Sequence, residues 1–301
     1  MDFELNTQER AAYDSAFGIA EAHEGEPADL IKALEDEGLF SLAARGATGR
    51  AAAVLAVEAA SRAAGLAPVG VHALVLPLLE AEAGHLGYVS GKAGEPVRFG
   101  AQADLGVVYE GSLARLYPFA PGEARPILSN YIYPLAVPAK PDGPALAQVE
   151  ASAVQRRYRQ AIGAEAVGAM SAVLDQLTAF LSERIQFGRR LGAFQALHHR
   201  MAELAVLLES SRWLVREAAW LDDDEASATA AAFVAKAARR ICYEAHQLTG
   251  ARGFTLDFGM HRHTLRLQLL SVEAGGASGH ATEAGEMRWR PIEDDSIQHT
   301  A

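Results

Sequence analysis

The sequence predicts a mainly α fold in which two helical domains flank a small antiparallel β domain. Apolar residues recur at helical spacing over residues 1–93 and again over residues 151–301. Between them, residues 94–150 hold eight of the twelve prolines and several short runs of β-prone residues. The second helical part has long helices with short connections, which is typical of a four-helix bundle. Half of the 301 residues are apolar, so the chain can bury a substantial core.

Helix start and stop signals divide the first 93 residues. Asn6 followed by Glu9 resembles a capping pair at the start of an apolar stripe. Pro27 suits the first turn of a second helix, and Gly38 suits its end. A third helix is expected over about residues 50–64, and a fourth apolar stretch follows it. These segments predict a helical N-terminal domain.

The middle of the chain predicts short strands. The β-prone runs are Val97–Phe99, Gly106–Tyr109, Leu113–Tyr117 and Tyr131–Val137. The sequence Lys-Pro-Asp-Gly-Pro at 140–144 has the composition of a turn. Because proline is excluded from the centre of a sheet, runs this short between prolines predict a small sheet of antiparallel strands.

Helical periodicity returns from Gln148 and defines three long helices. The apolar face of the first helix is Met170, Val173, Leu174, Leu177 and Leu181. The apolar face of the second helix is Met201, Leu204, Leu208, Val215 and Ala218. Asp222–Asp224 give the third helix an acidic start that suits its dipole, and Gly250 ends it. Residues 275–301 are rich in Gly and Glu, and their last part is expected to be mobile.

The composition excludes several classes of function. A net charge of -11 argues against a nucleic-acid surface, which needs clustered Lys and Arg. The single cysteine, Cys242, is expected to be a small buried hydrophobe in a reducing compartment. The first ten residues lack the features of a signal peptide, and no run of about 18 apolar residues could cross a membrane. The sequence therefore predicts a cytoplasmic protein without a nucleic-acid or membrane partner.

Two stretches of the C-terminal part resemble the acyl-CoA dehydrogenase family. Arg184–Gln195 is similar to the family's Arg-x-x-Phe-Gly-x-x-Leu-x-x-x-Gln segment. Gln247–Phe254 resembles the Gln-x-x-Gly-Gly-x-Gly-aromatic turn that follows it in the family. Leu34–Leu42 also looks like the end of the family's early helix. The resemblance covers residues 151–275 closely and 1–93 loosely, and it implies an acyl-CoA dehydrogenase-like fold.

The resemblance implies a site for flavin adenine dinucleotide (FAD) at a subunit boundary, where this chain reaches a neighbour's cofactor. Arg184 matches the cation at the pyrophosphate, a role that suits a planar guanidinium. The other matching positions are Gln186 and Phe187 beside the diphosphate and ribose, Leu191, Phe194 and Gln195 at the adenosine, and Gln247 and Gly250 in the turn against the pyrophosphate. Ala251 replaces the second glycine of that turn, which is expected to weaken the contact.

The family's catalytic base has no counterpart at the positions where the resemblance places it. That base is a glutamate that removes a proton alpha to the thioester carbonyl, so it must reach that proton. One family position falls here on Ala274 or Gly275, and the other falls on Tyr158. Glu273 lies one or two residues from the first position and is the alternative base. Glu165 is expected to be a solvated or interface residue.

The middle domain is also shorter than the family's pattern. Residues 94–150 lack the family's Thr-Glu-x-x-x-Gly-Ser-Asp-like run and its Trp-containing strand, which hold the flavin ring. Tyr109–Ser112 resembles the family's base motif but falls in the sheet region. Some bacterial members, notably in sterol and bile-acid side-chain breakdown, are heterotetramers of two unlike subunits. The resemblance thus implies a base-deficient subunit whose partner is a full-length acyl-CoA dehydrogenase subunit.

The implied function is α,β-desaturation of an acyl-CoA with a bulky, steroid-like acyl group. Its electrons would pass to an electron-transfer flavoprotein or a similar acceptor. The alternatives are a stand-alone homo-oligomer with Glu273 as base and a non-enzymatic assembly subunit. No metal is expected, because only Glu82–His85 has the Glu-x-x-His spacing of a di-iron bundle and Gly84 weakens a helix there. Arg262 and Arg266 follow the turn and are expected on a solvated helix face, and the alternative is contact with a coenzyme A phosphate or a partner.

Overall fold

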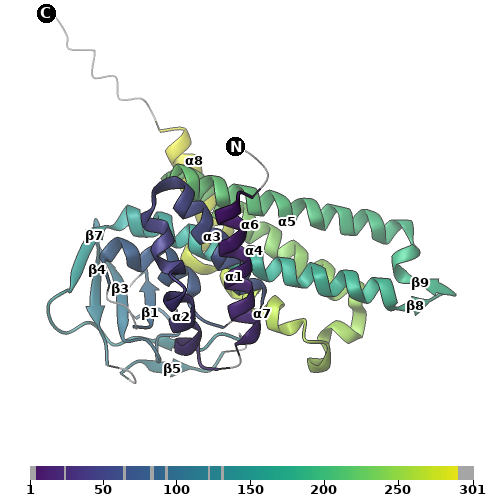
Figure 1. Cartoon of the computed structure of the whole chain (residues 1–301), viewed down its shortest axis with the longest axis horizontal. Helices are drawn as coiled ribbons and strands as arrows, with labels where there is room; N and C mark the ends of the chain where they lie inside the picture. Colours follow the sequence, from purple (N-terminus) through teal and green to yellow (C-terminus); the bar gives the residue numbers. More distant parts are fainter. Residues whose placement is uncertain are drawn as a thin grey trace, which may run out of the picture.

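Along the chain, helices precede and follow a small region of sheets, which confirms the predicted mainly α class. The computed structural model describes residues 5–23, 25–63, 66–81, 85–91, 94–120, 123–129 and 132–290. The N-terminal helices pack against the middle of the molecule, and the strands of the sheets lie at one end (Figure 1). The long C-terminal helices extend to the opposite end (Figure 1).

The N-terminal helices begin at the predicted signals. They are α1 (Thr7–Ala22), α2 (Pro27–Asp36), the 3-10 helix η1 (Leu39–Ala44), α3 (Gly46–Arg62), the π-helix η2 (Val71–Val75) and the 3-10 helix η3 (Leu76–Leu79). The Asn6 side chain accepts a hydrogen bond from the Glu9 N–H at 2.9 Å, and the Glu9 carboxylate accepts one from the Asn6 N–H at 3.0 Å. This reciprocal pair confirms the capping box at the start of α1.

The strands of the middle region form two small sheets. They are β1 (Gly87–Ser90), β2 (Val97–Arg98), β3 (Leu105–Glu110), β4 (Leu113–Pro118), β5 (Arg125–Ile127), β6 (Leu135–Val137) and β7 (Ala147–Glu150). The strand orders are β1-β3-β4-β7 and β2-β6-β5. The prediction of antiparallel pairing alone is wrong, because β1 runs parallel to β3. The chain leaves the first sheet after β1, passes through β2, and returns, which is a crossover that permits parallel pairing.

The C-terminal helices follow the predicted pattern. They are α4 (Ala151–Glu183), α5 (Gln195–Leu221), α6 (Asp224–Thr249), α7 (His261–Leu270) and α8 (Gly276–Arg288). The predicted apolar face of α4 is buried throughout, and that of α5 is buried except for Met201, which is half-buried. These faces pack into the main core of the molecule.

Helix α8 lies in the Gly- and Glu-rich stretch after residue 275, for which no helix was predicted from the sequence. Arg159 of α4 is buried and pairs with Glu283 of α8. The Arg159 Nε also donates to His280 Nδ1 at 3.3 Å. These tertiary contacts hold a helix that has little apolar periodicity of its own. Residues 291–301, which were predicted to be mobile, lie outside the described residues.

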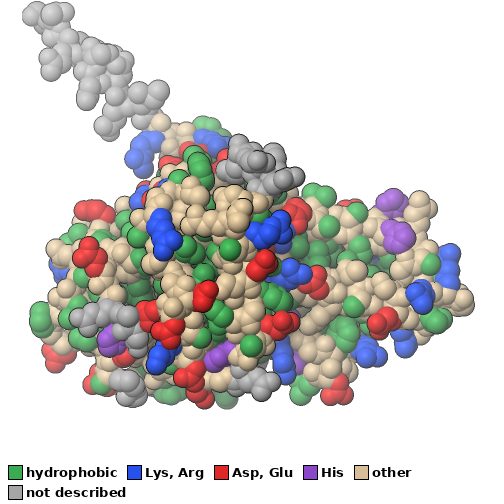
Figure 2. Space-filling view, in the orientation of Figure 1, with side chains coloured by type: hydrophobic (Ala, Val, Ile, Leu, Met, Phe, Trp, Pro, Cys, Tyr) green, Lys and Arg blue, Asp and Glu red, His purple; other side chains and the backbone are tan. Residues whose placement is uncertain are grey.

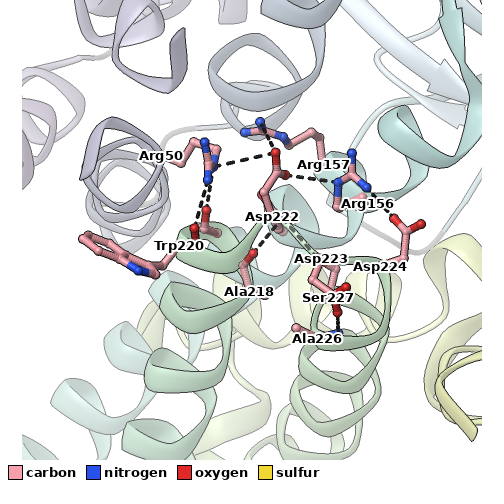
Figure 3. A network of polar contacts seen from close by, with 12 residues as sticks. Arg50, Arg156, Arg157, Ala218, Trp220, Asp222, Asp223, Asp224, Ala226 and Ser227 are labelled. Carbon is pink, nitrogen blue, oxygen red and sulfur yellow. Dashed lines mark hydrogen bonds and ion pairs between the residues drawn. The ribbon is translucent and has the colours of Figure 1, made fainter. Parts of the chain in front are cut away.

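The turn between α5 and α6 is fixed by ion pairs from two other helices (Figure 3). Arg156 and Arg157 of α4 donate to the Asp222 carboxylate at 3.1 and 2.9 Å. The Nε of Arg50 on α3 lies 3.9 Å from the same carboxylate. Asp223 caps α6 by accepting a hydrogen bond from a backbone N–H at 2.8 Å, which confirms the predicted acidic start.

One core joins the N-terminal helices to the C-terminal helices. It includes buried side chains of α1, α3, α4, α5, α6 and α7, whereas a smaller core lies between η2, η3 and the four-stranded sheet. The core is therefore continuous across residues 93 and 150, where the domain limits were predicted. These limits stay a prediction. In the described part of the chain, no helix is both long and apolar enough to cross a membrane.

Candidate functional site

The Phe-Gly pair of the first motif makes a tight hairpin at the far end of the bundle (Figure 1). β8 (Ile185–Gln186) and β9 (Arg189–Arg190) pair antiparallel across the two-residue connection. Both connecting residues have positive φ, 51° at Phe187 and 76° at Gly188. Positive φ at both positions is the requirement of a type I′ turn, which matches the twist of hairpin strands. The motif thus sets the path of the chain from α4 into α5.

Six of the eight predicted contact residues lie together on this hairpin or at its base. The Leu191 N–H donates to the Arg184 carbonyl at 2.8 Å and closes the hairpin. The Phe187 and Phe194 rings meet edge to face with centroids 6.2 Å apart, and the Arg189 guanidinium lies 3.9 Å from the Phe194 ring centroid. Leu191 and Phe194 are half-buried, whereas the other four are exposed: Arg184, Gln186, Phe187 and Gln195.

Arg184 lines a groove between α4 and the turn that follows α6. That turn contains two 3-10 helices, η5 (Gly250–Phe254) and η6 (Leu256–Phe258). The groove has a volume of about 510 Å³, and Arg184, Arg252 and Phe258 are among its lining residues. The Arg184 side chain is exposed and makes no ion pair with any residue in the described ranges. Its positive charge is therefore available to a ligand.

Positive side chains gather at this end of the molecule, although the chain as a whole is acidic (Figure 2). Arg184, Arg189 and Arg190 are exposed on the hairpin. His198 and His199 are exposed at the start of α5. Guanidinium groups concentrated in this way attract an anion such as a diphosphate.

Gln247 and Gly250, the remaining predicted contact residues, line a second pocket on the other side of η5. This pocket has a volume of about 610 Å³ and is also lined by Tyr243, His246 and Phe254. The His246 and Phe254 rings stack with centroids 4.5 Å apart. Gly250 has φ 57° and ψ -143°, a conformation that favours glycine, and it ends α6 as predicted.

Residues that flank the two motifs meet through aromatic packing. Phe258 of η6 packs edge to face on Phe180 of α4, with centroids 5.5 Å apart. Ala251, which replaces the family's glycine, lines the second pocket, and the next residue, Arg252, lines the groove of Arg184. Arg184 therefore lines one hollow, Gln247 and Gly250 line another, and the turn after α6 contributes to both. Arg252 was missed because it occupies a variable position of the turn motif, where its charge carried no family signal.

Tyr158, at one family base position, contacts Glu273, the residue before the other position. The Tyr158 hydroxyl donates to Glu273 Oε2 at 3.3 Å, and the Arg98 Nε donates to Glu273 Oε1 at 2.7 Å. Burial raises the pKa of the Glu273 carboxyl, while the Arg98 charge opposes that rise. Both oxygens have partners and only 13% of the side chain is exposed. Both Glu273 oxygens are thus engaged by side chains of the same chain.

Arg98 of β2 is the centre of this buried cluster. Its Nη1 donates to Glu165 Oε2 at 2.6 Å, and the Gly70 N–H donates to Glu165 Oε1 at 3.0 Å. Glu165 is only 2% exposed, so the prediction of a solvated or interface residue is wrong. The two carboxylates share one guanidinium, and this pairing permits the burial of both.

Arg266 was also predicted at the surface, and that prediction is wrong. It is 1% exposed and donates to the Tyr133 hydroxyl at 3.0 Å and to the Ser61 carbonyl at 2.8 Å. Arg266 therefore links α7 to α3 and the middle region. Arg262 is exposed and Cys242 is buried, as predicted for both.

The described residues contain no group of three or more His, Cys, Asp and Glu side chains arranged to hold a metal ion. Glu82 and Gly84 of the Glu-x-x-His pattern lie outside the described residues. His85 is described, and its Nδ1 lies 2.7 Å from Asp104 Oδ2. The Tyr-Glu-Gly-Ser sequence at 109–112 spans the connection between β3 and β4, in the sheet as predicted.

Residues 153–282 match the family model described as "Acyl-CoA dehydrogenase, C-terminal domain". Over these residues the chain is similar to the C-terminal domain of acyl-CoA dehydrogenases. The matched segment runs from α4 into α8 and contains the hairpin, the groove and both motifs. The resemblance to the family is thereby confirmed for the part of the chain that carries its motifs.

A curated relative supports the same assignment over the same part of the chain. The probable acyl-CoA dehydrogenase YngJ of Bacillus subtilis is 34% identical over 122 residues, which are 39% of this chain and 32% of that protein. The chain thus matches about a third of the length of that relative.

Solved structures extend the likeness to the fold of nearly the whole chain. The ChsE4-ChsE5 complex from Mycobacterium tuberculosis has a TM-score of 0.77 at 18% identity and covers 97% of this chain and 100% of that chain. A variant of the Tcur3481-Tcur3483 steroid acyl-CoA dehydrogenase has 0.71 at 21% identity, covering 93% and 97%. A glutaryl-CoA dehydrogenase from Mycobacterium smegmatis with FADH2 has 0.72 at 17% identity, covering 95% of each chain. These likenesses confirm the predicted acyl-CoA dehydrogenase-like fold.

Proposed function

We propose that this chain is a subunit of a flavin-dependent acyl-CoA dehydrogenase and contacts FAD across the boundary with a catalytic partner subunit. The observation that carries the proposal is the state of Arg184. Its guanidinium is exposed, lines a groove at the end of the bundle, and has no ion pair within the described residues. A guanidinium in this state can pair with a diphosphate that is held mainly by another chain.

The residues at this end fit the dinucleotide part of FAD. Arg184 binds the pyrophosphate, with Gln247 and Gly250 in the neighbouring turn. Phe187 is 87% exposed and Phe194 is half-buried beside it, so both rings offer surface to the ribose and adenine. One solved structure with this fold, the glutaryl-CoA dehydrogenase from Mycobacterium smegmatis, contains FADH2. This likeness supports FAD as the cofactor. When bound, FAD accepts the hydride that leaves the β-carbon of the acyl-CoA.

The catalytic base belongs to the partner in this proposal. Tyr158 and Ala274 occupy the two base positions of the family, and neither has a carboxylate. Glu273 stands next to the second position but is bound by Arg98 and Tyr158 in the interior. The role of the chain is therefore to bind and orient the cofactor.

Exposed apolar side chains around the hollows support a protein partner. These side chains are 61–87% exposed and comprise Ile185, Phe187, Tyr243, Phe254 and Leu256. Obligate interfaces commonly bury more than about 2,000 Å² and are rich in such residues. One neighbour of this fold is a complex of two named proteins, ChsE4 and ChsE5. We infer a partner that is a full-length acyl-CoA dehydrogenase subunit.

The substrate in this proposal is an acyl-CoA that loses hydrogen from its α and β carbons. A bulky, steroid-like acyl group is favoured because one neighbour is described as a steroid acyl-CoA dehydrogenase. The electrons pass on to an electron-transfer flavoprotein or a similar acceptor.

Two alternatives make different demands on the chain. A stand-alone homo-oligomer needs Glu273 as its base, although Arg98 and Tyr158 occupy both of its oxygens. A non-enzymatic assembly subunit needs neither the unpaired Arg184 nor the two hollows beside the turn.

The experiment that tests the proposal is affinity purification of the tagged chain from its native host. Co-purifying proteins are identified by mass spectrometry, and flavin absorbance and acyl-CoA dehydrogenation are measured for the complex and for the chain alone. We expect a yellow, active complex with an acyl-CoA dehydrogenase subunit, and a flavin-poor, inactive chain alone. A yellow, active chain without a partner supports the homo-oligomer, and a complex without flavin supports the assembly role.

A further inference from the structure

We propose that Arg252 is a second cofactor-binding cation, which pairs with the same pyrophosphate as Arg184. This inference rests on the proposed function and adds a residue that the family motif does not specify. Arg252 comes from the turn after α6, whereas Arg184 comes from the end of α4, and both line one groove of about 510 Å³. Two guanidinium groups from separate elements thus face one space.

A series of contacts connects the two arginines. The Arg184 N–H donates to the Phe180 carbonyl at 2.9 Å. The Phe180 ring packs edge to face on Phe258, and the Arg252 guanidinium lies 5.5 Å from the Phe258 ring centroid. A cation held over an aromatic face keeps its position while its remaining N–H groups stay free to donate.

The backbone of η5 fixes the direction in which Arg252 leaves the turn. Thr255 donates to the Arg252 carbonyl from its N–H at 3.0 Å and from its hydroxyl at 2.8 Å. A Cβ at Gly253 would lie 2.0 Å from the Thr249 Oγ1, so only glycine lets the turn lie this close to α6. Arg252 is therefore on a defined turn.

The charge of the groove suits an anion. Arg184 and Arg252 have no ion pair among the described residues, and the carboxylate of Glu183 is the acidic group among the residues that line the groove. The two arginines leave the groove net positive after Glu183 is counted. A pyrophosphate diester carries a negative charge on each phosphate, so two guanidiniums match it better than one. Arg252 also follows Ala251, where the loss of the family's glycine weakens the backbone contact.

The test uses the complex of the chain with its partner subunit, freed of flavin, and adenosine diphosphate (ADP) as the probe, because ADP contains the diphosphate and adenosine of FAD. Binding is measured by isothermal titration calorimetry at low salt, for wild type, Arg184→Ala, Arg252→Ala and Arg252→Lys. Arg262→Ala is the matched control, since Arg262 is another exposed arginine but does not line the groove. Circular dichroism checks that each variant is folded.

We expect Arg184→Ala and Arg252→Ala each to weaken ADP binding about 10-fold, as for the loss of a charged hydrogen bond. Arg252→Lys should recover part of the affinity, and Arg262→Ala should bind as wild type does. Loss in Arg184→Ala with unchanged binding in Arg252→Ala overturns this inference and leaves the proposed function standing. If the wild type does not bind ADP, or if neither arginine matters, both the inference and the proposed cofactor contact are overturned.

Discussion

The Tyr158 hydroxyl lies 3.3 Å from Glu273 Oε2, so the residue at one family base position contacts the alternative base beside the other position. Arg98 binds the other oxygen of Glu273 and also binds Glu165. In this chain, a closed polar cluster occupies the region around Tyr158. The cluster joins β2, α4 and Glu273, the residue before Ala274. A cluster of this kind stabilises the fold, and the proposed function places the base on the partner subunit.

Glu273→Gln should leave the turnover of the complex within about twofold of wild type, because Glu273 does not act as the base. Glutamine keeps the size of the side chain and can still accept a hydrogen bond from Arg98. The measurement is acyl-CoA dehydrogenation by the purified complex at saturating substrate. A loss of turnover of about 10² or more is expected of a general base, and such a loss would favour the homo-oligomer.

Arg98→Met should lower the free energy of unfolding by about 3–5 kcal/mol, because it leaves two buried carboxylates without their cation. Urea unfolding followed by circular dichroism measures the change. Adding Glu273→Gln to Arg98→Met should recover part of the stability, since one buried charge is removed. Arg115→Met is the matched control at an exposed ion pair of β4, and it should change the stability little. Equal stability of Arg98→Met and wild type would contradict the role given to the cluster.

Gly168→Ala should destabilise the protein by about 1–3 kcal/mol through crowding between α4 and α3. A Cβ at Gly168 would lie 2.2 Å from the Glu58 carbonyl oxygen and 2.8 Å from the Arg62 nitrogen, and backbone atoms cannot give way easily. Gly18→Ala is the control within α1, where a Cβ would meet nothing within 4 Å. It should stabilise the protein by about 0.5–1 kcal/mol. Thermal unfolding of the two variants checks the opposite signs.

Three buried histidines should make the protein less stable in acid. Burial lowers the pKa of His72 from 6.5 to about 3, that of His263 to about 3 and that of His280 to about 4. The unfolded chain binds more protons than the folded chain between these values and 6.5. The free energy of unfolding therefore falls as the pH drops from about 6.5 towards 4.

His72 offers a direct check of this pH dependence, because its Nε2 accepts the Gly87 N–H at 3.1 Å and must be neutral to do so. In His72→Gln, the dependence of the free energy of unfolding on pH should be smaller by about 1.4 kcal/mol per pH unit between pH 6 and 4, the value for one proton. Urea unfolding at pH 6, 5 and 4 measures the difference from wild type. Identical slopes in the two proteins would mean that His72 takes up its proton while the protein is folded.

Local signals predicted the elements that local forces determine. The capping box of Asn6 and Glu9 and the acidic cap at Asp223 begin their helices as expected, because each motif satisfies backbone N–H groups within its own turn. The hairpin turn at Phe187-Gly188 lies within the first motif. Arg184 is exposed beside its groove, which agrees with the cofactor role that the resemblance implies for it.

Long-range pairing could not be predicted in this way. Glu165 and Arg266 are charged residues on helices, and they are buried only because Arg98 and Ser61, far away in the sequence, supply their partners. Helix α8 lacks an apolar stripe and depends on Arg159 of α4. Strand β1 pairs with β3 and not with β2, the next strand in the sequence. A single sequence carries no local signal for such pairings.

The central claim is that this chain contributes Arg184, and not a base, to a flavin site shared with its partner. The most direct measurement is the FAD content per complex in Arg184→Ala and Arg184→Lys, determined from absorbance after purification at a fixed, limiting FAD concentration. We predict that Arg184→Ala weakens FAD binding about 10- to 150-fold, as for loss of a charged hydrogen bond, and lowers the FAD content accordingly. Arg184→Lys should recover only part, because lysine cannot make the two-pronged contact. Full FAD occupancy in Arg184→Ala at that limiting concentration would contradict the account.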